Sequence, residues 1–401
     1  MLFRGRPRGG GLTPAARVAA AIEILDAIGA GAPAEQTLTR WARGARYAGS
    51  GDRAAVRDHV YDALRRWRSL ARLGGAETGR GRMLGALRAA GVDPAGLFGG
   101  PGHAPGALTA SEAAHFAQPP AMTEAEALDC PDWLEPALRH SLGAEFAPVL
   151  RALQSRAPVF LRANLARGPR AAAAAALAEE GIDTIPSPVA DTALEVTAGA
   201  RRLRQSRAFA AGLVELQDAA SQAVVAELAP ASGLRVLDLC AGGGGKALAL
   251  AAHAGVEIWA HDAYSARMAD LPARADRAGV QIRQIARPED AAPFDLVLAD
   301  VPCSGSGSWR RDPEGKWRLT PERLGELCDI QAQILDRGTA LTAPGGRLAH
   351  ATCSLLAEEN TAQVAAFLDR HPGWRLDRQM RWTPLQGCDG FHLAILTHAG
   401  G

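Results

Sequence analysis

The 401-residue sequence lacks the features that would assign it to several specialised classes. Its six cysteines form no C-x-x-C pair and no regular spacing, so neither a disulfide framework nor a zinc ribbon is expected. No stretch approaches the roughly 20 uninterrupted apolar residues needed to cross a bilayer. The start, Met1 to Gly11, is rich in Arg and Gly and lacks the apolar core of a signal peptide. We therefore expect a soluble cytoplasmic protein.

Lysine is almost absent. Of the 44 basic residues only Lys246 and Lys316 are lysines, which hints at places that need a compact ammonium group, although two lysines could also survive by chance. The net charge of +1 hides an uneven distribution. Residues 1–92 carry 16 Arg against 7 acids, or +9, whereas residues 93–150 carry one Arg against 8 acids, or −7. A basic amino-terminal segment predicts contact with a polyanion.

The rest of the composition, 47% hydrophobic and 22% charged residues, is that of a globular chain. At about 150 residues per domain, the length predicts two or three domains. Residues 1–92 are expected to be all-helical, since Thr13 before Pro14 is a typical helix start and apolar residues follow at helical spacing. A second helix is expected to open at Asp52. The arginines beside it fit either a solvated face or RNA contact, and the +9 total favours RNA.

The middle of the chain changes character twice. Residues 94–125 are rich in Gly, Pro and Ala, which predicts a loose connection. The pattern over 151–228 then predicts a small α+β subdomain, with strands at 159–165 and 193–197 and a helix at 169–180. A further helix is expected at 216–228.

Residues 229–401 carry the pattern of a doubly wound α/β domain of the Rossmann-like type. Continuous apolar runs alternate with helical patterns, as in parallel strands covered on both faces, and these runs are 234–239, 257–261, 294–299 and 346–352. In such sheets a ligand sits beyond the carboxyl ends of the strands. The residues that follow each run are therefore the candidates for function.

A glycine-rich loop follows the first of these strands. Between Cys240 and Lys246 it would let the backbone approach a ligand closely, with free N–H groups at the start of the next helix. It is not a Walker A motif, because Cys240 replaces the first glycine and Ala247 replaces the magnesium-binding Ser or Thr. It does fit the nucleotide-binding pattern G-x-G-x-x-A, and Asp262 at the end of the next strand suits ribose hydroxyls. Either NAD or S-adenosylmethionine satisfies this pattern.

Two later strands are each followed by a cysteine. The DVPCSG run brings Asp300 and Cys303 to the ligand edge, and Cys353 follows the strand at 346–352. We expect the two thiols and Asp300 to converge, an arrangement for which a dehydrogenase has no use. His350 with Cys353 imitates one pair of zinc ligands, but no second pair completes a site, so no metal is expected. Three further cysteines are expected to be small buried hydrophobes, namely Cys130, Cys328 and Cys388.

Together these segments resemble the signature motifs of the Sun or RsmB-like RNA cytosine carbon-5 methyltransferases. The similarity covers residues 158–395 and includes the glycine loop, the DVPCSG run and the TCS run at 352–354, in the family's order. It extends to several short runs: Arg162-x-Asn164, the segment 212–221 with Gln217-Asp218, the segment 310–317, Glu358-Glu359-Asn360 and Asp389-Gly390-Phe391. The start of the chain, with Asp52-Arg53 and residues 61–66, resembles the NusB-like RNA-binding domain of RsmB-type members more distantly.

Some positions depart from the family's pattern. Gly243 stands where the family usually has proline, and His350-Ala351 replaces a Tyr-Ser pair before the TCS run. The Gly-Asp-Ala expected after the third strand is missing near 285–290. The adenine contact therefore stays unassigned among Arg287, Glu289 and Asp290.

The resemblance implies an enzyme that uses S-adenosylmethionine to methylate carbon 5 of cytosine in RNA. Carbon 5 is a poor nucleophile, and a thiolate added to carbon 6 makes it reactive. The family's motifs assign that thiolate to Cys353, contact with the amine edge and ring nitrogen 3 to Asp300, and help in enzyme release to Cys303. The implied cofactor-binding residues are Cys240, Ala241, Gly242, Gly243, Gly244, Lys246, Asp262, Arg267 and Asp300. Lys246 is expected to orient acidic groups or RNA phosphate.

A segment after the DVPCSG run mixes cations and aromatics, namely Trp309, Arg310, Arg311, Lys316 and Trp317. It fits either base stacking with phosphate binding, or tryptophans packed in the core beside solvated arginines. The target cytosine has to be unstacked to meet two thiols in a pocket.

Other functions stay open at this point. The RNA is ribosomal RNA, favoured by the RsmB-like start, or transfer RNA, and a catalytically silent RNA-binding scaffold is a rival. An NAD enzyme leaves both cysteine motifs unexplained. The sequence thus predicts a monomer without membrane or metal partners. Its expected parts are a helical RNA-binding domain at 1–92, an acidic Gly/Pro/Ala-rich connection and helices at 93–150, a small α+β subdomain at 151–228 and a methyltransferase domain at 229–401.

Overall fold

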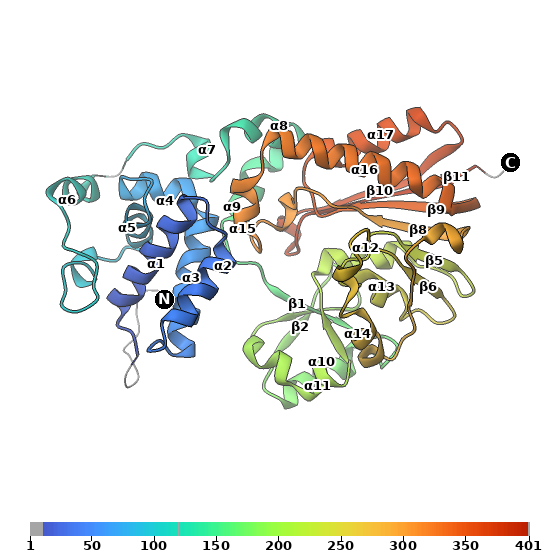
Figure 1. The fold of residues 1–401 in the computed structure, drawn as a ribbon, viewed down its shortest axis with the longest axis horizontal. Helices are drawn as coiled ribbons and strands as arrows, with labels where there is room; N and C mark the ends of the chain where they lie inside the picture. Colours follow the sequence, from blue (N-terminus) through green and yellow to red (C-terminus); the bar gives the residue numbers. More distant parts are fainter. Residues whose placement is uncertain (1–10, 119, 400–401) are drawn as a thin grey trace. The chain divides into compact units, whose positions relative to one another are not determined.

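The computed structural model describes residues 11–118 and 120–399, which form two compact units (Figure 1). The helical unit takes in the chain up to Pro136, then Ala144–Arg156 and Trp309–Arg318. The sheet unit takes in Ala137–Gly143, Ala157–Ser308 and the chain from Leu319 onward. The expected α+β subdomain therefore shares one unit with the main sheet. Residues 1–10, most of the Arg/Gly-rich start, lie outside the described residues.

The helical unit is built of short helices around an apolar core. Thr13 caps the first helix, as its pattern predicts, because its Oγ1 accepts a hydrogen bond from Ala16 N at 3.1 Å. The helix expected to open at Asp52 begins earlier, at Ser50, and Asp52 Oδ2 accepts from Gly49 N at 3.1 Å. The core includes Val18, Leu25, Val56, Leu64, Leu70 and Met83. The helices are α1 (Pro14–Gly29), α2 (Ala34–Gly44), α3 (Ser50–Arg65), α4 (Trp67–Gly74), α5 (Gly79–Ala89) and α9 (Phe146–Leu153).

The segment expected to be a loose connection contains helices. In α6 (Ala110–Ala117), Thr109 Oγ1 accepts from Glu112 N, and the Glu112 carboxylate accepts from Thr109 N. Arg80 of α5 hydrogen-bonds the same carboxylate and lowers the pKa of Glu112 to about 2. A second capping box begins α7 (Glu124–Ala127). Local capping outweighs the turn-forming composition here, so the expected irregular connection was wrong for these helices.

Residues 309–318 belong to the helical unit although they follow the DVPCSG run. They include α15 (Pro313–Arg318), where the indole N–H of Trp317 donates to Leu64 O of α3 at 2.7 Å. Burial lowers the pKa of Lys316 to about 8. The buried residues of this segment are Trp309, Arg310, Pro313 and Lys316. Of the two interpretations that the sequence leaves open, the burial of Trp309 and Lys316 favours core packing over base stacking and phosphate binding, whereas the buried Arg310 differs from the solvated arginine of that interpretation.

The small α+β layer of the sheet unit is antiparallel, in the order β2–β3–β1–β4. Its strands are β1 (Val159–Ala163), β2 (Thr184–Pro186), β3 (Ala193–Val196) and β4 (Val214–Leu216), and its helices are α10 (Arg170–Glu179), α11 (Arg207–Ala210) and α12 (Ala219–Leu228). The helix expected from residue 216 begins later, because Asp218 caps α12 by accepting from Ala220 N at 2.8 Å. Residues 214–216 pair with β1 instead.

The main sheet runs in the order β10–β11–β9–β8–β5–β6–β7 (Figure 1). The continuous apolar runs form parallel strands, as predicted, and the parallel set is β5 (Arg235–Asp238), β6 (Glu257–Ala260), β7 (Arg283–Gln284), β8 (Phe294–Asp300) and β9 (Thr342–Thr352). The hairpin of β10 (Trp374–Trp382) and β11 (Phe391–His398) is antiparallel, so the sheet is mixed. Its helices are α8 (Glu135–Leu142, mostly in this unit), α13 (Gly245–Leu250), α14 (Leu271–Ala278), α16 (Pro321–Leu341) and α17 (Thr361–Arg370).

The direction in which strands are added reverses at β5. β6 and β7 are added on one side of β5. The chain then crosses back and adds β8 and β9 on the other side. Such a switch point opens a crevice at the carboxyl ends of the strands. The glycine loop after β5 and the DVPCSG run after β8 both begin at this point.

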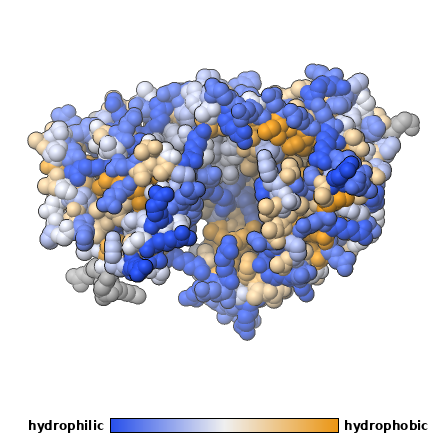
Figure 2. Space-filling model, viewed as in Figure 1, coloured by the Kyte–Doolittle hydropathy of each residue, from blue (hydrophilic) through white to orange (hydrophobic). Residues whose placement is uncertain are grey.

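The face of the molecule shown in Figure 2 is mostly hydrophilic. On the face shown in Figure 2, hydrophobic residues gather in small patches among hydrophilic ones. The most exposed large apolar side chains are Tyr47 and Tyr264, at 68% and 75%. Across residues 11–118 and 120–399, none of the helices has the length and apolar character to cross a membrane.

Candidate functional site

The glycine loop after β5 has a shape that glycine adopts without strain. Gly242 and Gly244 have φ angles of 52° and 77°, in the left-handed region. A Cβ on Gly244 would lie 2.3 Å from Leu271 Cδ1, so the position has no room for a side chain. Gly244 N donates to Ala241 O at 2.7 Å and closes a tight turn. A ligand can therefore approach the bare backbone of this loop.

Asp262 follows β6 and contacts the glycine loop directly. Its Oδ2 accepts from Gly242 N at 2.9 Å and from Arg267 at 3.1 Å, and its Oδ1 accepts from Tyr264 N at 2.9 Å. A carboxylate can accept about four hydrogen bonds, so Asp262 has capacity for one more donor. The Arg267 side chain is 59% exposed and lies over Gly242. The structure thus brings together Asp262, Arg267 and the glycine loop, as the sequence predicts.

Lys246 connects the glycine loop to the end of β8. Its Nζ lies 2.6 Å from Asp300 Oδ2 and 4.6 Å from the centroid of the Phe391 ring. The Lys246 side chain is only 8% exposed, whereas that of Asp300 is 30% exposed. The lysine therefore lies where it can orient an acidic group, and Asp300 keeps an edge that a ligand can reach.

The two thiols that follow β8 and β9 are in contact, as expected for neighbouring parallel strands. Cys303 Sγ lies 3.4 Å from Cys353 Sγ. The hydrogen bond from Cys303 lowers the pKa of the Cys353 thiol, and the charge of Lys246 acts in the same direction. The same bond raises the pKa of Cys303 well above its ordinary value, with burial and the charge of Glu359 adding to the effect. Cys353 is therefore the thiol that ionises first.

The buried carboxylate of Glu359 joins the two cysteine loops. It accepts from Ser304 N at 2.7 Å, and from the hydroxyls of Ser304 and Ser354 at 2.5 Å each. Gln331 Nε2 donates to it at 3.0 Å. Ser304 and Ser354 directly follow the two cysteines in sequence. One side chain thus fixes the backbone behind both thiols.

The remaining cysteines differ in their surroundings. Cys240 is half-buried at the start of the glycine loop, and burial raises the pKa of its thiol, so it stays neutral there. Cys130 and Cys388 are buried, as expected. Cys328 is only half-buried, with its thiol 3.6 Å from Glu358 O, so the expectation of a buried hydrophobe was wrong for it.

Histidine at position 350 is a core residue. It is fully buried, and burial lowers its pKa to about 3, which keeps the ring neutral. In the described part of the chain no three His, Cys, Asp or Glu side chains are grouped so that they could hold a metal ion. Of the residues left open for an adenine contact, Glu289 pairs with Arg337 and Arg287 lies near Asp290, so the structure does not single one out.

Two acidic residues at the site were not singled out by the sequence. Asp238 ends β5, and burial, with the nearby charge of Asp300, raises its pKa to about 7. Asp238 ends its strand just before the glycine loop, as Asp300 ends β8, and this position in the sequence indicates a site residue. Glu359 lies in a run that resembles the family, but the sequence does not indicate its role. Its contact with Ser304 joins residues 55 positions apart.

Comparison with known families gives two matches on this chain. The family model described as 16S rRNA methyltransferase RsmB/F matches residues 225–396. The model for the ferredoxin-like domain of RsmF/B-like methyltransferases matches residues 130–201. The two models together cover the main sheet, its loops and most of the small α+β layer.

Curated relatives also match this chain. A protein of Salmonella arizonae is 35% identical over 250 residues, covering 60% of this chain and 58% of that protein. A protein of Vibrio cholerae is 34% identical over 282 residues, covering 67% of this chain and 65% of that protein. Both are named ribosomal RNA small subunit methyltransferase B. The match thus spans less than two thirds of the length of these relatives.

A solved structure reproduces the fold over almost the whole chain. The crystal structure of PH0851 has a TM-score of 0.74, covers 96% of this chain and 99% of its own, and is 23% identical. At this identity the likeness establishes the fold.

Proposed function

We propose that this chain, which matches the RsmB/F methyltransferase models over residues 130–201 and 225–396, transfers a methyl group from S-adenosylmethionine to carbon 5 of a cytosine in ribosomal RNA. The observation that carries the proposal is the contact between Cys303 and Cys353 at 3.4 Å, close enough to Asp300 for its charge to act on Cys353. Covalent addition to a pyrimidine ring needs one thiolate, and its reversal can use a second thiol. Direct hydride transfer between an alcohol and NAD needs neither thiol.

The residues around the glycine loop fit S-adenosylmethionine, which supplies the methyl group when bound. Gly242 and Gly244 leave bare backbone in a left-handed turn. Asp262 retains capacity to accept a hydrogen bond, which suits a ribose hydroxyl. The set that would hold the cofactor is Cys240, Ala241, Gly242, Gly243, Gly244, Lys246, Asp262, Arg267 and Asp300.

In the proposed reaction the Cys353 thiolate bonds to carbon 6 of the cytosine, and the electron pair of the 5,6 double bond becomes available at carbon 5. Asp300, held by Lys246, accepts hydrogen bonds from the exocyclic amine and from ring nitrogen 3, which takes up a proton from solvent during the addition and so neutralises the charge that develops there. Once carbon 5 carries the methyl group it loses its proton to solvent, and the electron pair left behind re-forms the 5,6 double bond. The bond between carbon 6 and sulfur then breaks, and Cys353 leaves as a thiolate. Cys303, which retains its proton, assists that release.

The helical unit is proposed to dock the RNA. Its likeness to NusB-like domains rests on Asp52-Arg53 and residues 61–66. Independent support comes from the +9 balance of residues 1–92, because a pocket that receives one flipped base reads little of the surrounding RNA.

The proposal is tested with the full chain, ribosomal RNA and S-adenosylmethionine labelled in its methyl group. We expect label in 5-methylcytosine for the wild type and none for Cys353→Ala. Cys303→Ala should accumulate a protein–RNA adduct, because addition proceeds while release is impaired, and the adduct is visible as a slow band on a denaturing gel. Cys328→Ala, which removes a half-buried thiol that contacts neither Cys303 nor Cys353, is the control and should behave as wild type.

Three results would overturn the proposal or its parts. Label on another atom excludes cytosine carbon 5, and label on transfer RNA alone excludes ribosomal RNA. An adduct formed by Cys353→Ala but not by Cys303→Ala would reverse the two roles. Wild-type protein that binds the RNA but transfers no label under any condition would be a catalytically silent scaffold.

A further inference from the structure

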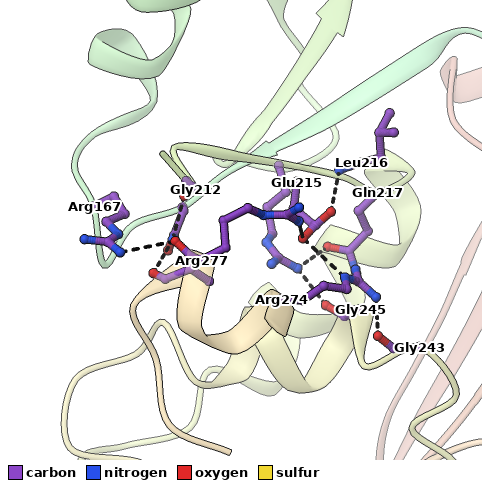
Figure 3. A network of polar contacts seen from close by, with 12 residues as sticks. Arg167, Gly212, Glu215, Leu216, Gln217, Gly243, Gly245, Arg274 and Arg277 are labelled. Atoms are coloured by element: carbon purple, nitrogen blue, oxygen red, sulfur yellow. Dashed lines mark hydrogen bonds and ion pairs between the residues drawn. The ribbon is translucent and has the colours of Figure 1, made fainter. Parts of the chain in front are cut away.

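The back of the glycine loop is held by side chains from outside its own strand and helix. Figure 3 shows Arg274 between Glu215 and the loop carbonyl of Gly243. A second arginine, Arg162, donates to Gly245 O at 2.7 Å. Gly243 and Gly245 flank the left-handed Gly244, so both arms of the tight turn are anchored.

Arg162 comes from β1 in the small α+β layer and is buried. The NH1 group that bonds Gly245 O also donates to Gln217 Oε1 at 2.6 Å. Burial lowers the pKa of Arg162 to about 10, which still leaves it charged at neutral pH. A buried guanidinium with two acceptors on one nitrogen has little freedom to move. The peptide between Gly245 and Lys246 is therefore fixed, and Lys246 is the residue that pairs with Asp300.

Arg274 comes from α14 and shares a carboxylate with its neighbour on that helix. Glu215 Oε2 of β4 lies 3.5 Å from Arg274 Nε and 2.6 Å from Arg277 NH2 (Figure 3). Both arginine side chains are 23% exposed. Only Arg274 reaches the glycine loop, whereas Arg277 lies over the Phe209 ring at 4.2 Å. The two residues thus form a natural matched pair.

A loop of consecutive glycines gains much conformational entropy when it is released, and a ligand has to overcome that freedom on binding. A planar peptide couples each carbonyl to the N–H of the next residue, so anchoring the carbonyls of Gly243 and Gly245 also sets the following N–H groups. We infer that Arg274 and Arg162 are positioning residues that preorganise the glycine loop for the cofactor. The small α+β layer is thereby part of the cofactor site. This inference rests on the proposed function.

The test is a calorimetric titration of the full chain with S-adenosylhomocysteine, comparing Arg274→Gln with Arg277→Gln. Each variant removes one arginine from Glu215, but only Arg274→Gln releases Gly243. We expect affinity to fall about tenfold for Arg274→Gln and to change less than about twofold for Arg277→Gln. Thermal melting should show similar small losses of stability for both. With S-adenosylmethionine as the varied substrate, KM should rise for Arg274→Gln while kcat changes little.

A conservative variant of Arg274 separates the effect of its hydrogen-bond geometry from the effect of its charge. Arg274→Lys keeps the cation beside Glu215 but has a single donor head in place of the guanidinium fork, so its affinity should lie between those of wild type and Arg274→Gln. Equal affinities for Arg274→Gln and Arg277→Gln would overturn the inference. A fall in kcat with unchanged KM would also overturn it. A wild type that binds no S-adenosylhomocysteine would instead contradict the proposed function, so the two failures are distinguishable.

Discussion

In a hydrogen bond between two thiols, the pKa of the accepting sulfur falls and that of the donating sulfur rises. The surroundings decide which sulfur donates. The bond from Cys303 lowers the pKa of Cys353, while burial and Glu359 add to the rise of the pKa of Cys303. Removing the donor in Cys303→Ala should therefore raise the pKa of Cys353. The pH midpoint of iodoacetamide alkylation at Cys353, followed by mass spectrometry of its peptide, should move to higher pH.

Serine at position 303 retains a hydroxyl donor, so Cys303→Ser should restore part of the lower midpoint. A midpoint that stays in place or moves to lower pH in Cys303→Ala would show that the thiol pair does not set the ionisation of Cys353.

Asp262 binds its own loop as well as the expected ligand. Because it accepts from Gly242 N and Tyr264 N, Asp262→Ala removes a ribose acceptor and an anchor of the glycine loop together. We expect binding of S-adenosylhomocysteine to weaken by roughly 1 to 3 kcal/mol, measured by calorimetry. Asp270→Ala makes the same chemical change at a carboxylate that does not contact Gly242, and it serves as the control. Tight binding of NAD with no response to S-adenosylhomocysteine would contradict the choice of cofactor.

Individual site residues were predictable where the chain itself places them at a strand end. Asp262, Asp300, Cys303 and Cys353 each follow a parallel strand, and parallel strands deliver their carboxyl ends to one edge. Glu359 and Arg274 act through partners far along the sequence, and no periodicity reports such a partner. A motif therefore locates reacting groups better than it locates the residues that hold them.

Among the secondary-structure elements, the short turn η8 (Ala357–Glu359) before α17 has an influence beyond its length. It carries the carboxylate that accepts from both Ser304 and Ser354. In Glu359→Gln one acceptor oxygen becomes an NH₂ donor, which cannot serve the N–H and hydroxyl donors that now meet it. The rate of protein–RNA adduct formation should fall about tenfold or more, while affinity for S-adenosylhomocysteine should change little.

The neighbouring Glu358→Gln is a matched control for this element, because it makes the same chemical change without a contact to Ser304 or Ser354. If Glu359→Gln forms the adduct at the wild-type rate, the turn does not set the geometry of the thiols. If cofactor affinity falls as much as adduct formation, the variant has disturbed the whole sheet unit.

Elements whose identity depends on long-range pairing were the ones that sequence patterns missed. Residues 214–216 continue the apolar pattern of α12, yet they pair with β1 and form β4. The β10–β11 hairpin makes the sheet mixed, although the strands read from apolar runs are parallel. In the opposite direction, capping at Thr109 builds a helix in a segment whose composition suggests turns.

At the scale of the whole chain, the two units are not continuous in sequence. The chain leaves the sheet unit after Ser308, contributes α15 to the helical unit and returns at Leu319. A domain boundary drawn from composition cannot find such an exchange. The composition of the segment with Trp309 and Lys316 is the same whether these side chains face RNA or are buried in a core. The burial of Lys316 removes it from the cations available to a polyanion.

Several of the available cations of the helical unit lie around the connection between α2 and α3. Many of the unit's arginines are neutralised, for example Arg57 by Glu35 and Arg80 by Glu112. Among the described residues, four exposed arginines around the α2–α3 connection pair with no acid, and Tyr47 beside them is 68% exposed. These four are Arg40, Arg43, Arg46 and Arg53. Cations interleaved with an exposed aromatic suit single-stranded RNA.

If these four arginines neutralise about four phosphates, the logarithm of RNA affinity should fall with the logarithm of salt concentration at a slope near −3. Replacing the four arginines by glutamine should flatten that slope and leave binding of S-adenosylhomocysteine unchanged, because the glycine loop belongs to the sheet unit. The control removes the same charge from the sheet unit at Arg201, Arg202, Arg204 and Arg207. Fluorescence anisotropy over a salt series measures both. A slope flattened only by the control would move RNA docking to the small α+β layer and leave the amino-terminal charge to another partner.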